Sequence, residues 1–149
     1  MRAGILLALC CALAARADDG IGFQISAEGA ETGIAVYPGA KALKNDKDSQ
    51  ALSMAFWGGS KDFRLSLAKY WSADDADRIA EFYRTDLAKF GRVVDCSAEP
   101  DDPICGDASR EDGVIELRAG KKKDRRIVAI SPKTGGCKIV LLHLRTRGL

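Results

Sequence analysis

The residues with the clearest chemical potential form a basic run in the C-terminal third of the chain. Five cations stand within six positions: Lys121, Lys122, Lys123, Arg125 and Arg126. Clustered ammonium and guanidinium groups bind phosphate, lipid headgroups or acidic polysaccharide. No aromatic residue interleaves the run, so it lacks the stacking surface that binds single-stranded nucleic acid. These five residues are the candidate anion-binding site, without nucleic acid, but the pattern favours a solvated hairpin turn whose charges also protect a sheet edge.

A second set of candidate ligands is acidic and precedes the basic run: Asp95, Glu99, Asp101, Asp102 and Asp107. Carboxylates in a loop are the ligands that Ca²⁺ prefers. Their spacing lacks the glycine and the terminal glutamate of an EF-hand loop. We therefore expect a solvated loop and no bound metal.

The chain has a single histidine, His143, between Leu142 and Leu144. One histidine excludes a multi-histidine metal centre. A catalytic histidine needs a nucleophile or acid–base partner and an orienting group, which the sequence does not place. We expect an ordinary strand residue, and we assign no catalytic residue. Gly58-Gly59 lacks the layout of a nucleotide-binding loop, so no cofactor is expected.

The N-terminus has the layout of a secretory signal peptide. A short positive start precedes the apolar run Gly4–Ala15, and Ala15-Arg16-Ala17 is a small-x-small cleavage signature. The apolar run is too short to span a bilayer, which takes about 20 residues. We predict a signal peptide over 1–17 and a periplasmic or secreted mature chain over 18–149, without a transmembrane segment. A buried N-terminal helix and lipid attachment at Cys10 or Cys11 are the alternatives.

Cleavage would change the charge balance. The whole chain has 23 Lys and Arg against 21 Asp and Glu, for a net charge of +2. Loss of Arg2 and Arg16 would leave 21 of each, so the mature chain would be neutral. An anionic partner would therefore need a local patch of cations rather than a global field.

Three cysteines remain after the predicted cleavage: Cys96, Cys105 and Cys137. In an oxidising compartment two of them are expected to pair. Cys96 and Cys105 bracket SAEPDDPI, a loop-like segment whose ends can meet, so we favour this pair. The pairs Cys105–Cys137 and Cys96–Cys137 remain open, because spacing does not determine connectivity.

One amphipathic helix and several strands must position these residues. Ile79, Tyr83 and Leu87 lie on an apolar stripe at helical spacing, and Ser72 with Asp75 resembles a capping box. Gly91 follows as a helix stop, which predicts a long helix over 73–90. The strand patterns cover 21–27, 34–37, 52–57, 62–71, 113–119, 126–131 and 138–145.

The connections between these strands are short, and short connections join antiparallel neighbours. Residues 52–57 and 62–71 are expected to form a hairpin through a Gly-rich turn. The predicted fold is one α+β domain: a single, mostly antiparallel sheet with the long helix packed on one face. Four aromatic residues near the ends of this hairpin would line a pocket or join the core: Phe56, Trp57, Tyr70 and Trp71.

Two segments carry a resemblance to known sequences. Tyr37-Pro38-Gly39-Ala40 is followed by Glu81-Phe82-Tyr83-Arg84, with Leu87 and Gly91 beyond it. This resembles uncharacterised bacterial secreted proteins that pair a YPGA segment with a later FYR…L…G helix. The resemblance spans residues 34–95, implies a bacterial envelope protein and carries no activity.

We therefore expect a small exported bacterial envelope protein, a non-catalytic binding or accessory module. Its partner would be an unknown envelope protein or an anionic ligand. One alternative is a small enzyme with an unrecognised site, such as His143 with a carboxylate. The other is a polyanion binder that uses residues 121–126.

Overall fold

The computed structural model describes residues 22–26, 32–43, 51–58, 61–108 and 110–148, with side chains described outside 22–26 and 51–58. The predicted signal peptide, residues 1–17, lies outside the described residues.

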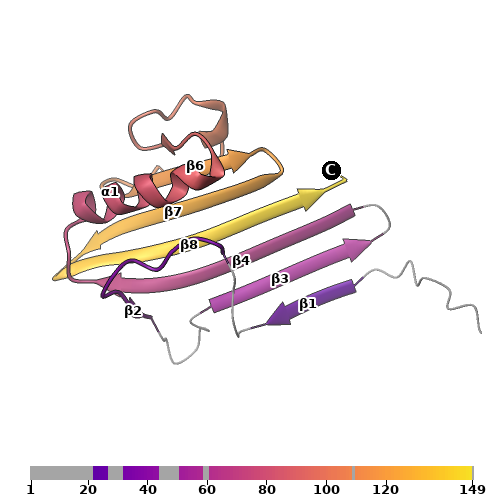
Figure 1. Ribbon diagram of the computed structural model, residues 1–149, viewed down its shortest axis with the longest axis horizontal. Helices are drawn as coiled ribbons and strands as arrows, with labels where there is room; N and C mark the ends of the chain where they lie inside the picture. The colour runs from indigo at the N-terminus through magenta and orange to yellow at the C-terminus, as the bar shows by residue number, and fades with distance from the viewer. Residues whose placement is uncertain (1–21, 27–31, 44–50, 59–60, 109, 149) are drawn as a thin grey trace, which may run out of the picture.

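The described strands form one sheet in which every neighbouring pair is antiparallel (Figure 1). The strand order is β1-β3-β4-β8-β7-β6-β5, and β2 also pairs with β4. The strands are β1 (Gly22–Ser26), β2 (Lys41–Ala42), β3 (Ala51–Gly58), β4 (Lys61–Ser72), β5 (Val94–Asp95), β6 (Ile115–Lys121), β7 (Asp124–Lys133) and β8 (Gly136–Arg147). The predicted α+β class and antiparallel sheet are confirmed.

Three hairpins and one crossover build this order. The hairpins join β3 to β4, β6 to β7 and β7 to β8. After β4 the chain crosses through the helix α1 (Ala76–Leu87) to the far edge strand β5 and returns strand by strand. The last strand, β8, therefore pairs with β4 along most of their lengths and joins the two halves of the sheet.

The helix is shorter than expected. It runs over Ala76–Leu87, and a 3₁₀ turn continues it over Ala88–Phe90 before Gly91. Asp75 caps the helix by accepting a hydrogen bond from the Arg78 backbone N–H at 2.9 Å. Ser72 belongs to β4 and accepts from the Asp74 N–H instead. The prediction of a long helix over 73–90 is therefore wrong at its start, because strand pairing takes the residues before the cap.

The main core lies between α1 and one face of the sheet. Ile79, Ala80, Tyr83 and Leu87 are buried on the helix. They join a cluster of buried sheet residues on the same face: Leu117, Ala119, Val128, Ile130, Cys137, Ile139 and Leu141. We call this side of the sheet the helix face. Alternation along a strand places every second residue on the opposite side, which we call the reverse face.

The predicted strand at 34–37 does not form. This segment runs without sheet pairing and packs on the helix face, where Ile34 and Tyr37 join the core (Figure 1). Its backbone N–H groups bond to the helix instead of to a strand. Ala35 donates to Asp86 at 3.0 Å and Tyr37 donates to the Tyr83 hydroxyl at 3.2 Å.

The four aromatic residues of the predicted cluster are divided between two ends of the sheet. Phe56 and Trp57 pair in register with Phe63 and Asp62 beside the β3–β4 turn. Tyr70 and Trp71 lie at the other end of β4, where β2 and β8 flank them. At about 3.3 Å per residue the two pairs are some 23–30 Å apart, so the four residues do not line one pocket. Tyr70 instead packs against the main core, as the core alternative expects.

We predict that Gly120→Ala strongly destabilises the β6–β7 hairpin. Gly120 has φ +103°, and an added Cβ would overlap the carbonyl oxygen of Asp124. Left-handed strain and overpacking together should lower the free energy of unfolding by about 2–4 kcal/mol. Urea unfolding measures this.

The matched control is Gly135→Ala in the β7–β8 turn. Gly135 has φ +82° with nothing within 4 Å of the added Cβ, so only the strain of about 1–2 kcal/mol should appear. Equal losses in the two variants would contradict the close approach at Gly120.

Candidate functional site

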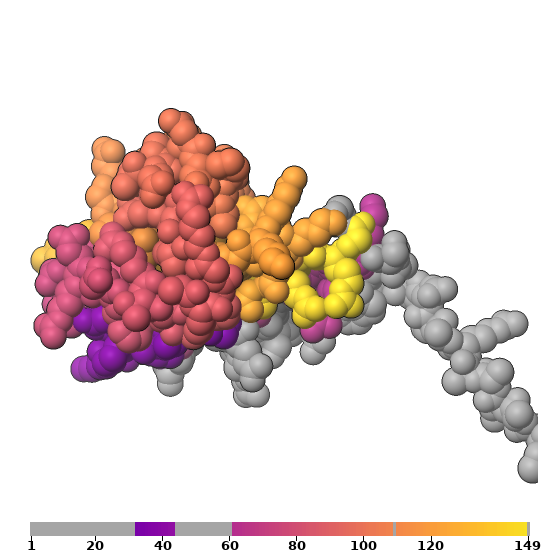
Figure 2. All heavy atoms as spheres, turned by 45° about the horizontal axis from the view of Figure 1, so that its top comes forward, coloured from indigo at the N-terminus to yellow at the C-terminus, as the bar shows by residue number. Residues whose placement is uncertain are grey.

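The structure divides the basic run between the two sides of the sheet. Lys121 pairs with Asp124 across the β6–β7 hairpin, and Lys122 and Lys123 form the turn between them. Arg125 and Arg126 follow on β7 and point to opposite faces, because successive strand residues alternate. In Figure 2 the orange hairpin projects from the surface beside the helix. The five cations therefore do not form one patch.

Arg126 lies on the helix face and is held by its neighbours. Its guanidinium donates to the Thr32 carbonyl at 3.1 Å, pairs with Asp124 and lies 4.6 Å from the centre of the Phe90 ring. His143 lies beside it on β8, with Nε2 2.8 Å from the same Asp124 carboxylate. This arrangement anchors the segment before Tyr37 to the end of the sheet.

Burial sets the protonation of this histidine. It lowers the pKa of His143 below its ordinary 6.5, and the hydrogen bond that the ring donates to Asp124 opposes the shift without cancelling it. At Asp124 burial acts in the opposite sense, yet the His143 hydrogen bond and the Arg126 charge leave its pKa lowered. His143 lines neither of the two clefts described next.

Two cations of the run, Lys122 and Arg125, meet Arg92 at a cleft of about 460 Å³ between the β6–β7 hairpin and the loop that follows β5, and Lys121 and Lys123 do not line it. The three lining cations come from separate segments: Arg92 before β5, Lys122 in the turn and Arg125 on β7. The rest of the lining is one carboxylate and three residues of loop or strand: Asp102, Pro103, Ile104 and Gly120. We call this cavity the basic cleft.

A disulfide and a buried arginine hold the loop wall of the basic cleft. Cys96 and Cys105 form the predicted disulfide with a Cα–Cα distance of 5.4 Å, and Cys137 is free and buried. Arg118, only 3% exposed, donates to the Ile104 carbonyl at 2.8 Å and pairs with Asp107. The hydrogen bond from Arg118 lowers the pKa of Asp107. The wall is therefore fixed from beneath before any ligand binds.

The cations at the cleft differ in their freedom. Arg125 is held by the Lys122 carbonyl at 3.1 Å and by Asp107 at 3.4 Å. Arg92 pairs with Asp102 at 2.8 Å, although its side chain is 67% exposed. Lys122 is exposed, and in the described part of the chain its ammonium has no ion pair. One largely buried guanidinium, one exposed guanidinium and one exposed ammonium thus face the cavity.

The acidic candidates are dispersed among basic partners. Asp95 pairs with Arg84 and Asp107 with Arg118, while Asp102 and Glu99 both meet Arg92. Asp101 has no role in either cleft. Within the residues that the structure describes, no three acidic, histidine or cysteine side chains are grouped to hold a metal ion.

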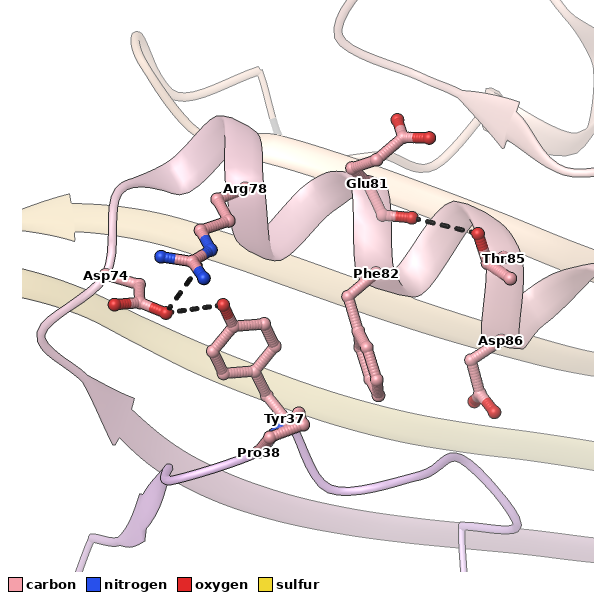
Figure 3. Close-up of a pocket in the computed structure, with 8 residues that line it drawn as sticks. All are labelled: Tyr37, Pro38, Asp74, Arg78, Glu81, Phe82, Thr85 and Asp86. Carbon is pink, nitrogen blue, oxygen red and sulfur yellow. Dashed lines mark hydrogen bonds and ion pairs between the residues drawn. The ribbon is translucent and has the colours of Figure 1, made fainter.

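A second cleft, of about 610 Å³, lies between α1 and Tyr37-Pro38 (Figure 3). The Tyr37 hydroxyl donates to Asp74 at 2.5 Å, which raises the pKa of Tyr37, and Arg78 lies 4.0 Å from the same carboxylate. Phe82 forms an edge-to-face contact with Tyr37, with ring centres 5.3 Å apart. The polar groups here bond to one another, and these contacts hold the segment that contains Tyr37 against the helix.

The contact between Tyr37 and Phe82 brings together the two segments on which the sequence resemblance rests. They are 46 residues apart at Tyr37 and Tyr83, yet a hydrogen bond joins them. The sequence signal for this contact is the YPGA turn. Buried backbone N–H groups need hydrogen-bond partners, and here the Tyr83 hydroxyl on the helix supplies one for Tyr37. The two segments thus lie together because they pack against each other in the fold, and the contact assigns them no reactive group.

Comparison with known protein families, curated proteins and solved structures found no match. In the described part of the chain, no helix has the length and apolar character to cross a bilayer.

We predict that replacing both Cys96 and Cys105 by Ser lowers the free energy of unfolding by about 2.7 kcal/mol, the chain-entropy value for a closed loop of roughly ten residues. Urea unfolding with and without reductant measures the loss. Non-reducing peptide mapping of the wild type should link Cys96 to Cys105. A main species linked through Cys137 would contradict this pairing.

We predict a loss of stability on mild acidification that depends on His143. Its folded pKa is lowered, so below about pH 6.5 the unfolded chain binds a proton that the folded chain does not. The free energy of unfolding should therefore fall as pH drops from 7 to 5. His143→Gln should flatten this slope in urea unfolding, because the chain has no other histidine.

Asp124→Asn serves as the matched variant. It removes the group that opposes the shift at His143, so the slope should persist and extend to lower pH. A wild type with flat stability between pH 7 and 5 would contradict the assignment.

Proposed function

We propose that the protein is a small exported envelope module, non-catalytic, that binds an anionic ligand in the basic cleft. The observation that carries this is the convergence of Arg92, Lys122 and Arg125 on one cavity from three separate segments. Guanidinium groups bind phosphate and carboxylate through paired N–H donors, and an ammonium adds a point charge. A wall held by a disulfide and by Arg118 limits the ordering cost of binding.

The ion pairs that Arg92 and Arg125 form with carboxylates of the protein position these guanidinium groups and still allow them to bind an anion. The carboxylates of Asp102 and Asp107 hold Arg92 and Arg125 in place. An incoming anion can exchange with Asp102 at Arg92, because that guanidinium is largely exposed and an exposed ion pair contributes about 0–1 kcal/mol. Lys122 has no carboxylate partner among the described residues that an anion would have to displace. The ligand is therefore expected to bind weakly and with strong salt dependence.

Export is proposed from the N-terminal pattern, with cleavage after Ala17, and the disulfide supports an oxidising compartment. A neutral mature chain gives no general attraction for polyanions, so the local cleft has to supply the affinity. The His143–Asp124 pair is the one feature that favours the alternative, a small enzyme. Asp124 binds both His143 and Arg126, and Arg126 donates to the Thr32 carbonyl, which supports an anchoring role instead.

We predict that sn-glycerol 3-phosphate binds the mature protein and that Lys122→Ser weakens binding about five- to tenfold, since a charge-assisted contact is worth roughly 1–1.5 kcal/mol. Binding should weaken as salt rises. Isothermal titration calorimetry at low ionic strength measures the dissociation constant.

Lys133→Ser is the matched control, because Lys133 is an exposed lysine at the opposite end of β7. It should bind like the wild type, and both variants should unfold like it. Absence of binding by the wild type, or equal losses in both variants, would remove the basic cleft as the anion site.

A further inference from the structure

The reverse face carries a row of apolar side chains that the core does not use. Six of them come from the three central strands: Leu65, Leu67, Ile127, Val140, Leu142 and Leu144. Each alternates along its strand with helix-face residues, and each is half-buried. None belongs to either hydrophobic cluster of the described residues. The helix and the segment 32–40 do not cover them, because both pack on the other face.

Cross-strand pairing makes five of these six side chains continuous. Leu67 pairs with Leu142, which pairs with Ile127 on its other side. In the next row on the same face, Leu65 pairs with Leu144. Directly opposed side chains in a sheet touch one another, so these five form one apolar surface. Val140 extends it, two residues from Leu142 on the same face of β8.

Arg125 connects this apolar surface to the basic cleft. It pairs in register with Leu144 on β8 and with Gly120 on β6, and both Arg125 and Gly120 line the cleft. The cleft therefore opens at the end of the apolar row, on the same side of the sheet. A ligand with a charged end and an apolar end would meet matching chemistry at both.

Charge on the reverse face of the three strands that carry the apolar row has a single sign. At the reverse-face positions of the described strands β4, β7 and β8, every charged residue is basic: Lys61, Lys69, Arg125, Lys133 and Lys138. A second copy of this chain docked on this face would bring these cations together, and like charges oppose association. An acidic amphiphile matches both the charge and the apolar row.

The length of the row fits a hydrocarbon chain. From Val140 to Leu144 along β8 the row extends about 13 Å, at some 3.3 Å per residue. The chains of one bilayer leaflet are about 15 Å long. Beyond the row on β4, past Lys69, Trp71 lies between Lys41 and Lys138 in the cross-strand register. Tryptophan suits such a boundary, because its ring is apolar and its N–H is polar.

We infer that the ligand of the basic cleft is an acidic lipid, with its anionic headgroup at Arg92, Lys122 and Arg125 and its chain along the reverse face. This inference rests on the proposed function and names its ligand class. Arg125 provides the junction between the two parts of the site.

The experiment compares butyl phosphate with dodecyl phosphate, both below the concentration at which micelles form, by titration calorimetry. Each methylene removed from water strengthens binding about fourfold, from ~0.8 kcal/mol. A one-sided sheet surface removes only part of the chain from water, so dodecyl phosphate should bind about tenfold tighter or more. Dodecyl maltoside, which lacks the charge, should bind more weakly than dodecyl phosphate.

The double variant Leu67→Thr with Leu142→Thr should lose the advantage of the longer chain and keep the wild-type affinity for butyl phosphate. Retained butyl phosphate binding also shows that this variant is folded. Val140→Thr should reduce the advantage, while the same substitution at Val36, an exposed valine outside the reverse face, should not. Lys122→Ser should weaken both phosphates by the same factor.

Each other outcome separates the two proposals. If butyl phosphate binds and the longer chain adds nothing, or if its advantage survives in the double variant, the lipid inference is wrong and the anion site stands. If neither phosphate binds, the proposed function fails with it. A wild-type dimer in light scattering that the double variant converts to a monomer would show that a second copy covers this face and would overturn the inference.

Discussion

The antiparallel pairing of β4 with β8 is the constraint on which the rest of the structure depends. It runs from Asp62 opposite Arg147 to Ser72 opposite Cys137 and joins an early hairpin to the last strand of the chain. The crossover through α1 must therefore deliver the chain to the far edge of the sheet, so that β5 to β8 can return to β4. A slip of one residue would exchange the two faces, exposing Leu141 and burying Leu142.

Local patterns in the sequence predicted the elements that have one buried side. The stripe of Ile79, Tyr83 and Leu87 placed the helix, and the alternation in 62–71 placed β4. The start of the helix was wrong because a capping box at Ser72 and a cap at Asp75 both fit the sequence. Long-range strand pairing decided between them, and no local pattern contains that information. The same holds for 34–37, a strand-like segment that bonds to the helix.

The candidate site was only half predictable. The basic run stood out in the sequence, but its interpretation as one patch ignored the two-residue period that sends Arg125 and Arg126 to opposite faces. Arg92 lines the basic cleft although it lies 30 residues before Lys122 in the chain. The start of β5 and the β6–β7 turn come together only because β5 pairs with β6 in the sheet. The burial of Arg118 could not be predicted from the sequence, because an arginine in a strand has the same pattern whether it is exposed or buried. It is buried here because the loop after β5 covers it.

Strands β4, β7 and β8 distribute charge differently between their two faces. On the helix face Arg64 pairs with Asp62, and Arg126 pairs with Asp124. Each of those cations has a counter-charge two residues away on its own strand. The reverse face of the same strands places lysines beside leucines without an acid in the strand pattern. Such positions protect a single-layer sheet from aggregation, since a repeated charge discourages a second sheet from docking. Because these cations oppose the docking of a second copy of the chain, the reverse face stays accessible to an amphiphile with an apolar chain and a negative charge.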